Sequence, residues 1–118
     1  MEFELSGHAG LLLWKQTLIN IVLRRGPDLT TRQLSVMLIV YLEPKAHTVR
    51  GLAATLKVSK PVITRCIDSL SMLGLIKRVR DQDDKRSVFI QRTVKGAVFL
   101  TDFAEIIEKS NEEVKTNN

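Results

Sequence analysis

Polar and basic side chains recur between residues 59 and 68 at the spacing of one helix face. Lys60, Thr64 and Asp68 are four residues apart and Arg65 lies beside them, so a helix would present them on one side. Such a face can read duplex DNA. An Arg makes a bidentate contact to guanine, a Lys reaches guanine or phosphate, and a Thr meets a thymine methyl or a phosphate oxygen. The pattern predicts a helix in the major groove, with Arg65 as the main reader of bases.

A second charged group occupies the polar run of residues 81–86. An Arg at the tip of a hairpin suits the negative potential of a narrow minor groove, which makes Arg86 a candidate with Asp84 beside it. The alternative is a solvated surface pair of these two residues that contributes almost nothing to stability. The complete set of DNA-binding candidates is Ser59, Lys60, Pro61, Thr64, Arg65, Asp68, Arg78, Asp84, Lys85 and Arg86.

The helix that must position the first group follows from local signals. Ser59 is a favourable N-cap, and Pro61 suits the first helical turn because an N–H there would have no partner in the helix. The helix is expected to run to about Leu73, where Gly74 closes it in the left-handed conformation. Its buried side is expected to consist of apolar residues: Ile63, Ile67 and Leu70.

Two further elements complete the arrangement. A short helix is predicted over residues 49–56 with Thr48 as its cap, and the β-prone runs 75–80 and 87–92 flank the polar turn as a hairpin. In a winged helix-turn-helix the second helix enters the major groove, the first braces it across the backbone, and the hairpin reaches toward the minor groove. The predicted fold class is therefore mainly α with a small β-hairpin wing (α+β), and residues 28–93 form the DNA-binding core.

One more helix is predicted between residues 30 and 42. Thr30 and Gln33 have the spacing of a capping box, and Pro44 ends the helix. Its apolar face is expected to consist of Leu34, Leu38 and Tyr41, with Met37 and Val40 beside it. His47, in the following segment, is expected to be exposed.

Helices over residues 9–25 and 94–114 are predicted to flank the core within a single domain, residues 1–118. The first is apolar on more than one face, and a monomer of this size offers one surface to cover it. A second copy of the chain would supply the other surface, so a homodimer is expected. The interface candidates are Leu11, Leu12, Trp14, Leu18, Ile19, Val22, Phe99, Phe103, Ile106 and Ile107.

The net charge of +5 is concentrated in one segment. Residues 57–95 contain ten Lys and Arg against four Asp, whereas residues 96–118 contain five acids against two Lys. A basic segment indicates a polyanionic partner, although a solvated basic surface is the plainer alternative. Only six of the 118 residues are aromatic, which argues against a protein that stacks single-stranded bases on rows of rings.

The sequence lacks the residues that characterise several other classes of protein. The single cysteine, Cys66, excludes an internal disulfide, fits a reducing cytosol, and is interpreted as a buried small hydrophobe rather than a redox sensor. Two His residues leave no metal-ligand cluster, and no phosphate loop or nucleophile motif is present, so neither an enzyme nor a cofactor is predicted. Without a secretory signal or a membrane-length apolar stretch, the protein is expected in the cytoplasm with no membrane partner.

Several motifs follow one another in a recognisable order: Leu52-Ala53, Val58-Ser59-Lys60-Pro61, Ile63-Thr64-Arg65, Leu70, Gly74-Leu75, Asp81-x-x-Asp84-x-Arg86-Ser87 and Thr93-x-x-Gly96. Together they resemble the MarR (multiple antibiotic resistance regulator) family of winged helix-turn-helix transcriptional regulators, over about residues 29–100. The resemblance implies that Arg86 inserts into the minor groove and that Asp84 orients it.

Two features depart from the family pattern. Arg92 stands where the family usually has an aliphatic residue, so this end of the second wing strand is expected to face solvent or phosphate. The chain is also short, with one C-terminal helix of about twenty residues where members usually have longer helices that build the dimer and line an effector pocket. A homodimer is still expected, whereas a small-molecule effector is not established.

Two functions from different classes fit these observations. The leading hypothesis is a sequence-specific regulator that binds double-stranded DNA as a homodimer on a pseudo-palindromic site, with its recognition helices about 34 Å apart. The alternative is a winged-helix protein–protein interaction module without DNA binding, in which the apolar flanking helices contact a different protein.

Overall fold

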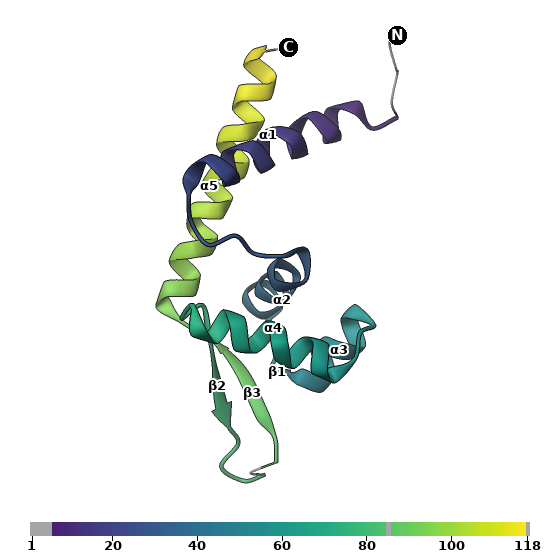
Figure 1. The fold of residues 1–118 in the computed structure, drawn as a ribbon, viewed down its shortest axis with the longest axis vertical. Coiled ribbons are helices and arrows are strands. Elements are labelled where there is room, and N and C mark those ends of the chain that lie inside the picture. Colours follow the sequence, from purple (N-terminus) through teal and green to yellow (C-terminus); the bar gives the residue numbers. More distant parts are fainter. Residues whose placement is uncertain (1–5, 85, 118) are drawn as a thin grey trace. The chain divides into compact units, whose positions relative to one another are not determined.

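The computed structural model describes residues 6–84 and 86–117 (Figure 1). They form two compact units. One joins the residues up to Asp28 with those from Leu100 onward, and the other is the continuous segment Leu29–Phe99. The second unit contains the winged helix-turn-helix. Lys85, one of the DNA-binding candidates, lies outside the described residues.

The first two helices of the second unit begin where the sequence places their caps. α2 (Thr31–Leu42) follows Thr30, whose hydroxyl accepts the Gln33 N–H at 3.1 Å, while Gln33 Oε1 accepts the Thr30 N–H at 2.8 Å. The predicted capping box is therefore confirmed. α3 (Val49–Leu56) follows Thr48, whose hydroxyl accepts the Gly51 N–H at 3.0 Å.

We expect Thr30→Ala to lower the free energy of unfolding by about 1 kcal/mol, because it removes the hydroxyl oxygen that accepts the Gln33 N–H. Urea denaturation followed by circular dichroism would measure the change. Thr31→Ala is the matched control, since Thr31 is also exposed and follows Thr30 directly but is not the cap. Equal effects of the two substitutions would contradict a contribution from the cap itself.

The third helix, α4 (Lys60–Met72), carries the predicted DNA-reading face. Ser59 has the extended backbone of an N-cap, but its hydroxyl makes no capping hydrogen bond, so the expected side-chain cap is absent. Pro61 lies in the first turn as predicted. Gly74 follows the helix with φ at 76°, which confirms the left-handed end, and the Leu75 N–H donates to the Leu70 carbonyl oxygen at 3.0 Å.

The wing is part of a three-stranded antiparallel sheet. The strands are β1 (His47–Thr48), β2 (Ile76–Arg80) and β3 (Val88–Arg92), in the order β1-β3-β2. β2 and β3 form the predicted hairpin. The sequence did not predict β1, whose two residues pair with Ile90 and Phe89 of β3. A strand of two residues is too short for an alternating pattern to appear in the sequence.

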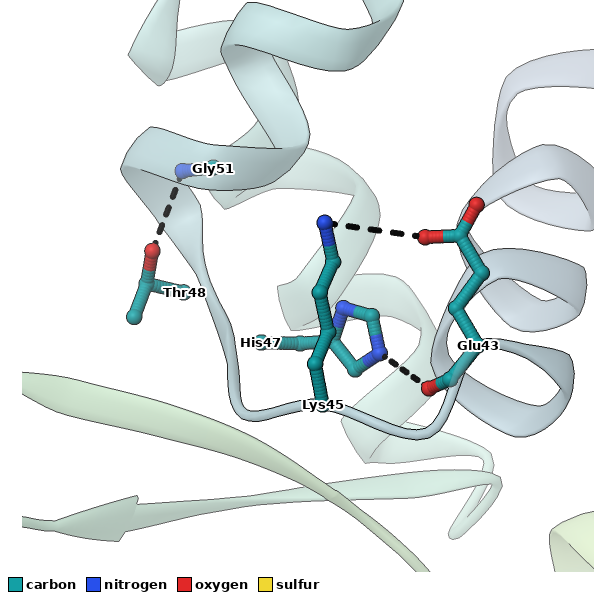
Figure 2. Close-up of polar contacts among 5 residues, drawn as sticks. All are labelled: Glu43, Lys45, His47, Thr48 and Gly51. Atoms are coloured by element: carbon teal, nitrogen blue, oxygen red, sulfur yellow. Dashed lines mark hydrogen bonds and ion pairs between the residues drawn. The ribbon is translucent and has the colours of Figure 1, made fainter.

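The pairing of β1 also explains why the expected exposure of His47 is wrong. This residue lies opposite Ile90 in the sheet and is only 5% exposed. Figure 2 shows its ring at the turn between α2 and α3, with Nε2 2.9 Å from the Glu43 carbonyl oxygen. Because a carbonyl oxygen only accepts, Nε2 carries the proton in this bond. The imidazole therefore satisfies a backbone group at the end of α2.

The core of the second unit is built from apolar side chains of all three helices and the sheet. The residues that are at most 3% exposed are Val36, Met37, Val40, Leu52, Ile63, Ile67, Leu70, Leu75, Ile76 and Ile90. The buried face of α2 is therefore rotated from the one predicted, since Leu38 is 37% exposed and Leu34 is only half-buried. Several apolar faces are available on such a helix, and the sequence alone does not select among them.

The Tyr41 hydroxyl joins α2 to the segments that flank the wing. It donates to the Leu75 carbonyl oxygen at 2.5 Å and accepts the Thr93 N–H at 3.0 Å. Thr93 Oγ1 in turn donates to the Gly74 carbonyl oxygen at 2.7 Å and accepts the Gly96 N–H at 2.9 Å. The Thr-x-x-Gly motif thus caps the last helix and ties it to the end of α4 and the start of β2.

Arg92, the departure from the family pattern, has an exposed side chain as expected. It is nevertheless held in place. Its Nε donates to the Val40 carbonyl oxygen at 3.1 Å, and its guanidinium lies 5.9 Å from the centroid of the Tyr41 ring. This Arg therefore satisfies a carbonyl near the end of α2, where a cation is favourable.

The first unit contains α1 (His8–Arg24) and most of α5 (Val94–Asn117), which ends three residues beyond the prediction. Asn20 Nδ2 donates to Ser110 Oγ at 2.9 Å and to Glu113 Oε1 at 2.8 Å, which links the two helices. Thr17 and Ser110 are buried but donate to carbonyl oxygens of their own helices. Over the described ranges, no helix combines the length and apolar character needed to cross a membrane.

Most of the predicted interface residues of α1 are exposed. The large apolar side chains of α1 that are 43–72% exposed are Leu11, Trp14, Leu18, Ile19, Val22 and Leu23. Leu12 and Ile106 are half-buried, and Ile107 is 37% exposed. Phe99 and Phe103 are already buried within the chain and leave little side-chain surface for a partner.

Candidate nucleic-acid interface

The outward face of α4 carries the predicted DNA-reading residues. All the candidates at this helix are exposed: Ser59, Lys60, Pro61, Thr64, Arg65 and Asp68. The opposite side is buried in the core through Ile63, Cys66, Ile67 and Leu70, as the sequence predicts. Burial at spacings of three and four residues fixes the rotation of the helix and leaves the polar residues facing solvent.

Two candidates pair with each other. Arg78 Nη2 of β2 donates to Asp68 Oδ1 of α4 in a hydrogen-bonded ion pair on the surface. Both side chains are largely exposed, so the pair contributes little to stability. Its consequence is geometric, because it connects the wing strand to the DNA-reading helix. The sequence predicts Asp68 and Arg78 as two independent DNA contacts. In the structure the two side chains are instead bonded to each other.

The turn of the wing is shaped by Asp84. One carboxylate oxygen accepts the Arg86 N–H at 3.1 Å, and the other accepts the Ser87 hydroxyl at 3.0 Å. The Ser87 N–H also donates to the Asp84 carbonyl oxygen at 2.9 Å. Asp84 therefore fixes the backbone of the turn at Arg86 and Ser87. In the described part of the chain, the carboxylate of Asp84 makes no ion pair with the Arg86 guanidinium, which stays exposed.

Two hollows border the DNA-reading face. One of about 570 Å³ lies between the start of α2 and α4 and is lined by Thr30, Thr31, Arg32, Gln33, Ser35, Val62, Arg65, Cys66 and Ser69. The other, of about 350 Å³, lies between the starts of α3 and α4 and the wing and is lined by Thr48, Val49, Arg50, Lys60, Arg86, Ser87 and Val88.

Arg50 is a basic residue beside this face that is not among the residues predicted from the sequence. It is the second residue of α3 and is exposed. Nothing in its local sequence distinguishes it from any other surface Arg. A signal was available in the cap at Thr48, which places Arg50 in the first turn of the bracing helix, where a helix-turn-helix crosses the DNA backbone.

The chemistry of the face is that of polyanion binding. Among the described residues, no group of three or more His, Cys, Asp or Glu is placed to hold a metal ion. Apart from the Asp68 carboxylate, which pairs with Arg78, the exposed polar groups are guanidinium, ammonium and hydroxyl donors, which suit phosphate oxygens and the acceptor atoms of bases.

The model of the MarR family matches residues 29–88, which is 60 of the 118 residues. This chain belongs to the MarR family. The matched segment includes α2, α3, α4 and the wing turn, and therefore most of the second unit of this MarR family member. No curated protein sequence matches that of the chain.

Solved structures of transcriptional regulators share the fold of this MarR family chain. A mutant of MepR from S. aureus bound to an oligodeoxyribonucleotide is 19% identical, with 99% of this chain and 86% of that chain covered and a TM-score of 0.81. The transcriptional regulator Tm0710 from Thermotoga maritima is 20% identical, with 93% and 75% covered and a TM-score of 0.75. A mutant of MarR from E. coli is 23% identical, with 100% and 88% covered and a TM-score of 0.68. At these identities the likeness shows a common winged-helix fold.

Proposed function

We propose that this MarR family chain is a sequence-specific transcriptional regulator that binds double-stranded DNA as a homodimer on a pseudo-palindromic site. The observation that carries the proposal is the outward face of α4, whose donors are exposed while its opposite side is buried. In this arrangement Arg65 reads a base edge in the major groove, and Arg86 reaches the adjacent minor groove from the wing. Membership of the family supports DNA-binding regulation in general, and the similar MepR mutant is bound to an oligodeoxyribonucleotide.

The proposed homodimer depends on α1. Six large apolar side chains of this helix are at least 43% exposed in a single chain. Contiguous apolar surface of this kind is normally covered by a partner. A second copy of the chain would cover it symmetrically and place two α4 helices on half-sites about 34 Å apart.

Selection of bound duplexes from a random pool at defined salt tests this function, and two variants sharpen the test. We expect Arg65→Ala to relax the sequence preference at one position per half-site, with a loss of about 1–3 kcal/mol of discrimination. Arg86→Ala should instead weaken binding to many sequences and lower the slope of log K against log salt by about one. Fluorescence anisotropy with the selected duplex and with shuffled duplexes measures both effects.

Lys109→Ala is the control, since this residue of α5 is exposed and lies outside the proposed interface with DNA. It should leave the sequence preference unchanged. Absence of duplex affinity in the wild-type protein at low salt would overturn the proposed function. The same holds if both Arg variants bind as the wild type does.

The exposed apolar face of α1 also fits the alternative function, a winged-helix module that binds another protein. Light scattering of the purified chain separates the two. A homodimer supports the regulator, whereas a monomer that does not bind duplex DNA supports the interaction module.

A further inference from the structure

Three cationic side chains from three separate elements line one hollow of the second unit. Arg50 comes from the first turn of α3, Lys60 is the first residue of α4, and Arg86 belongs to the turn of the wing. The hollow measures about 350 Å³, and Thr48 and Ser87 contribute hydroxyl groups to its wall. The fold therefore brings together cationic residues that are up to 36 positions apart in the sequence.

In the described part of the chain, no ion pair neutralises the cations of this hollow, and the nearby Asp84 carboxylate bonds to the Arg86 N–H and the Ser87 hydroxyl instead. No carboxylate lines the hollow, and neither described ion pair involves any of its three cations. The first turns of α3 and α4 also contain no acidic residue. Because the start of a helix carries partial positive charge, the cations of Arg50 and Lys60 are repelled by the helix ends on which they lie. A bound anion would remove this repulsion.

We propose that Arg50 and Lys60 bind one phosphate of the DNA backbone in this hollow, next to the place where Arg86 enters the minor groove from the wing. The proposal rests on the proposed DNA-binding function and adds a specific phosphate site and a residue, Arg50, to it. Thr48 fits the same role. Its hydroxyl oxygen accepts the Gly51 N–H, which leaves its own O–H free to donate to a phosphate oxygen.

Binding a phosphate here would position the DNA-reading elements without reading sequence itself. One phosphate would connect α3 and α4 to the same DNA strand, so that Arg65 and Arg86 enter their grooves in a fixed register. Arg50 is therefore a positioning residue. Its loss should weaken binding to all duplexes and leave base preference unchanged, which distinguishes it from Arg65.

The first arm of the test measures the salt dependence of binding to a duplex of random sequence. Arg50→Gln should lower the slope of log K against log salt by at most about 0.9, the value for one lost phosphate contact, because Lys60 still binds the same phosphate. Lys109→Gln removes a charge of the same sign from an exposed site on α5 and should leave the slope unchanged. Arg50→Gln should not lower Tm, because it removes a cation from the positive end of a helix.

The second arm uses the selected duplex with single backbone phosphates replaced by neutral methylphosphonates. Wild-type protein should lose affinity at several phosphates in each half-site, and replacement of one of these phosphates should cost Arg50→Gln less affinity than it costs the wild type. If Arg50→Gln keeps the wild-type slope, or loses as much affinity as the wild type at every position, the phosphate site is overturned. If Arg65→Ala still relaxes the sequence preference as expected, the proposed function stands even when the phosphate site does not. If the wild-type protein binds no duplex, both proposals are overturned.

Discussion

Gly96→Ala should lower the free energy of unfolding of the second unit by about 3 kcal/mol. A β-carbon at Gly96 would overlap the Tyr41 hydroxyl and the Leu75 carbonyl oxygen and would lie 2.7 Å from Tyr41 Cζ. These atoms are held by the hydrogen bonds that join α2, β2 and the start of α5. Since one of them is backbone, the overlap can be relieved only by displacing a chain segment. Urea denaturation measures the loss.

Gly10→Ala is the matched control for this prediction. Gly10 is also helical, but a β-carbon there would have no neighbour within 4 Å. This substitution should leave stability unchanged or raise it by about 0.5–1 kcal/mol, because Ala is the better helix former. Tyr41→Phe removes one of the two overlapping atoms, so its cost and that of Gly96→Ala should not add in the double variant. Additive losses, or a Gly96→Ala protein as stable as the wild type, would contradict a steric cause.

Leu18→Glu should convert the proposed homodimer into a monomer and lower the affinity for the selected duplex at least about a hundredfold. Leu18 lies in the middle of the exposed apolar face of α1 and is 44% exposed in the single chain. A carboxylate there would be buried without a partner in a dimer interface but would remain solvated in a monomer. The affinity falls because a dimer that is bound at one half-site holds its second subunit close to the other half-site. Separate chains lose this gain in effective concentration. Light scattering and fluorescence anisotropy measure the two effects.

Leu42→Glu makes the same chemical change at the end of α2, where Leu42 is 71% exposed. It should leave the mass in solution unchanged. Both variants should keep the helical content of the wild type, since neither position is buried. A Leu18→Glu protein with the mass of a dimer would show that α1 is not the interface.

The elements of the second unit could be predicted because their ends are marked by local chemistry. Thr30, Thr48 and Pro61 are at the start of helices, and Gly74 follows one with positive φ. Each signal depends on the hydrogen-bonding or steric properties of one residue and its neighbours within about a turn. The spacing of the apolar residues in α4 likewise predicted which side of this helix is buried.

The same local rules did not predict contacts between segments that are distant in the sequence. The strand β1 exists because the turn after α2 runs along the edge of β3, and this pairing buries His47. α2 has apolar residues on several sides, and packing against the rest of the unit selects Val36, Met37 and Val40. The Asp68–Arg78 pair joins residues that the sequence predicts as separate DNA contacts.

The candidate DNA-binding residues also divide into those that the sequence could predict and those that depend on distant contacts. Lys60, Thr64 and Arg65 could be named from the sequence because helical periodicity assigns residues to a face before the fold is known. Arg50 was not named, although the Thr48 cap places it in the first turn of α3, because its proposed role depends on two other cations, which come from α4 and the wing. The sequence by itself determined the helices, the two strands of the wing, their order and the polar face of α4. The tertiary structure alone decided which charged groups meet across those elements, since such proximity arises only when the core has packed.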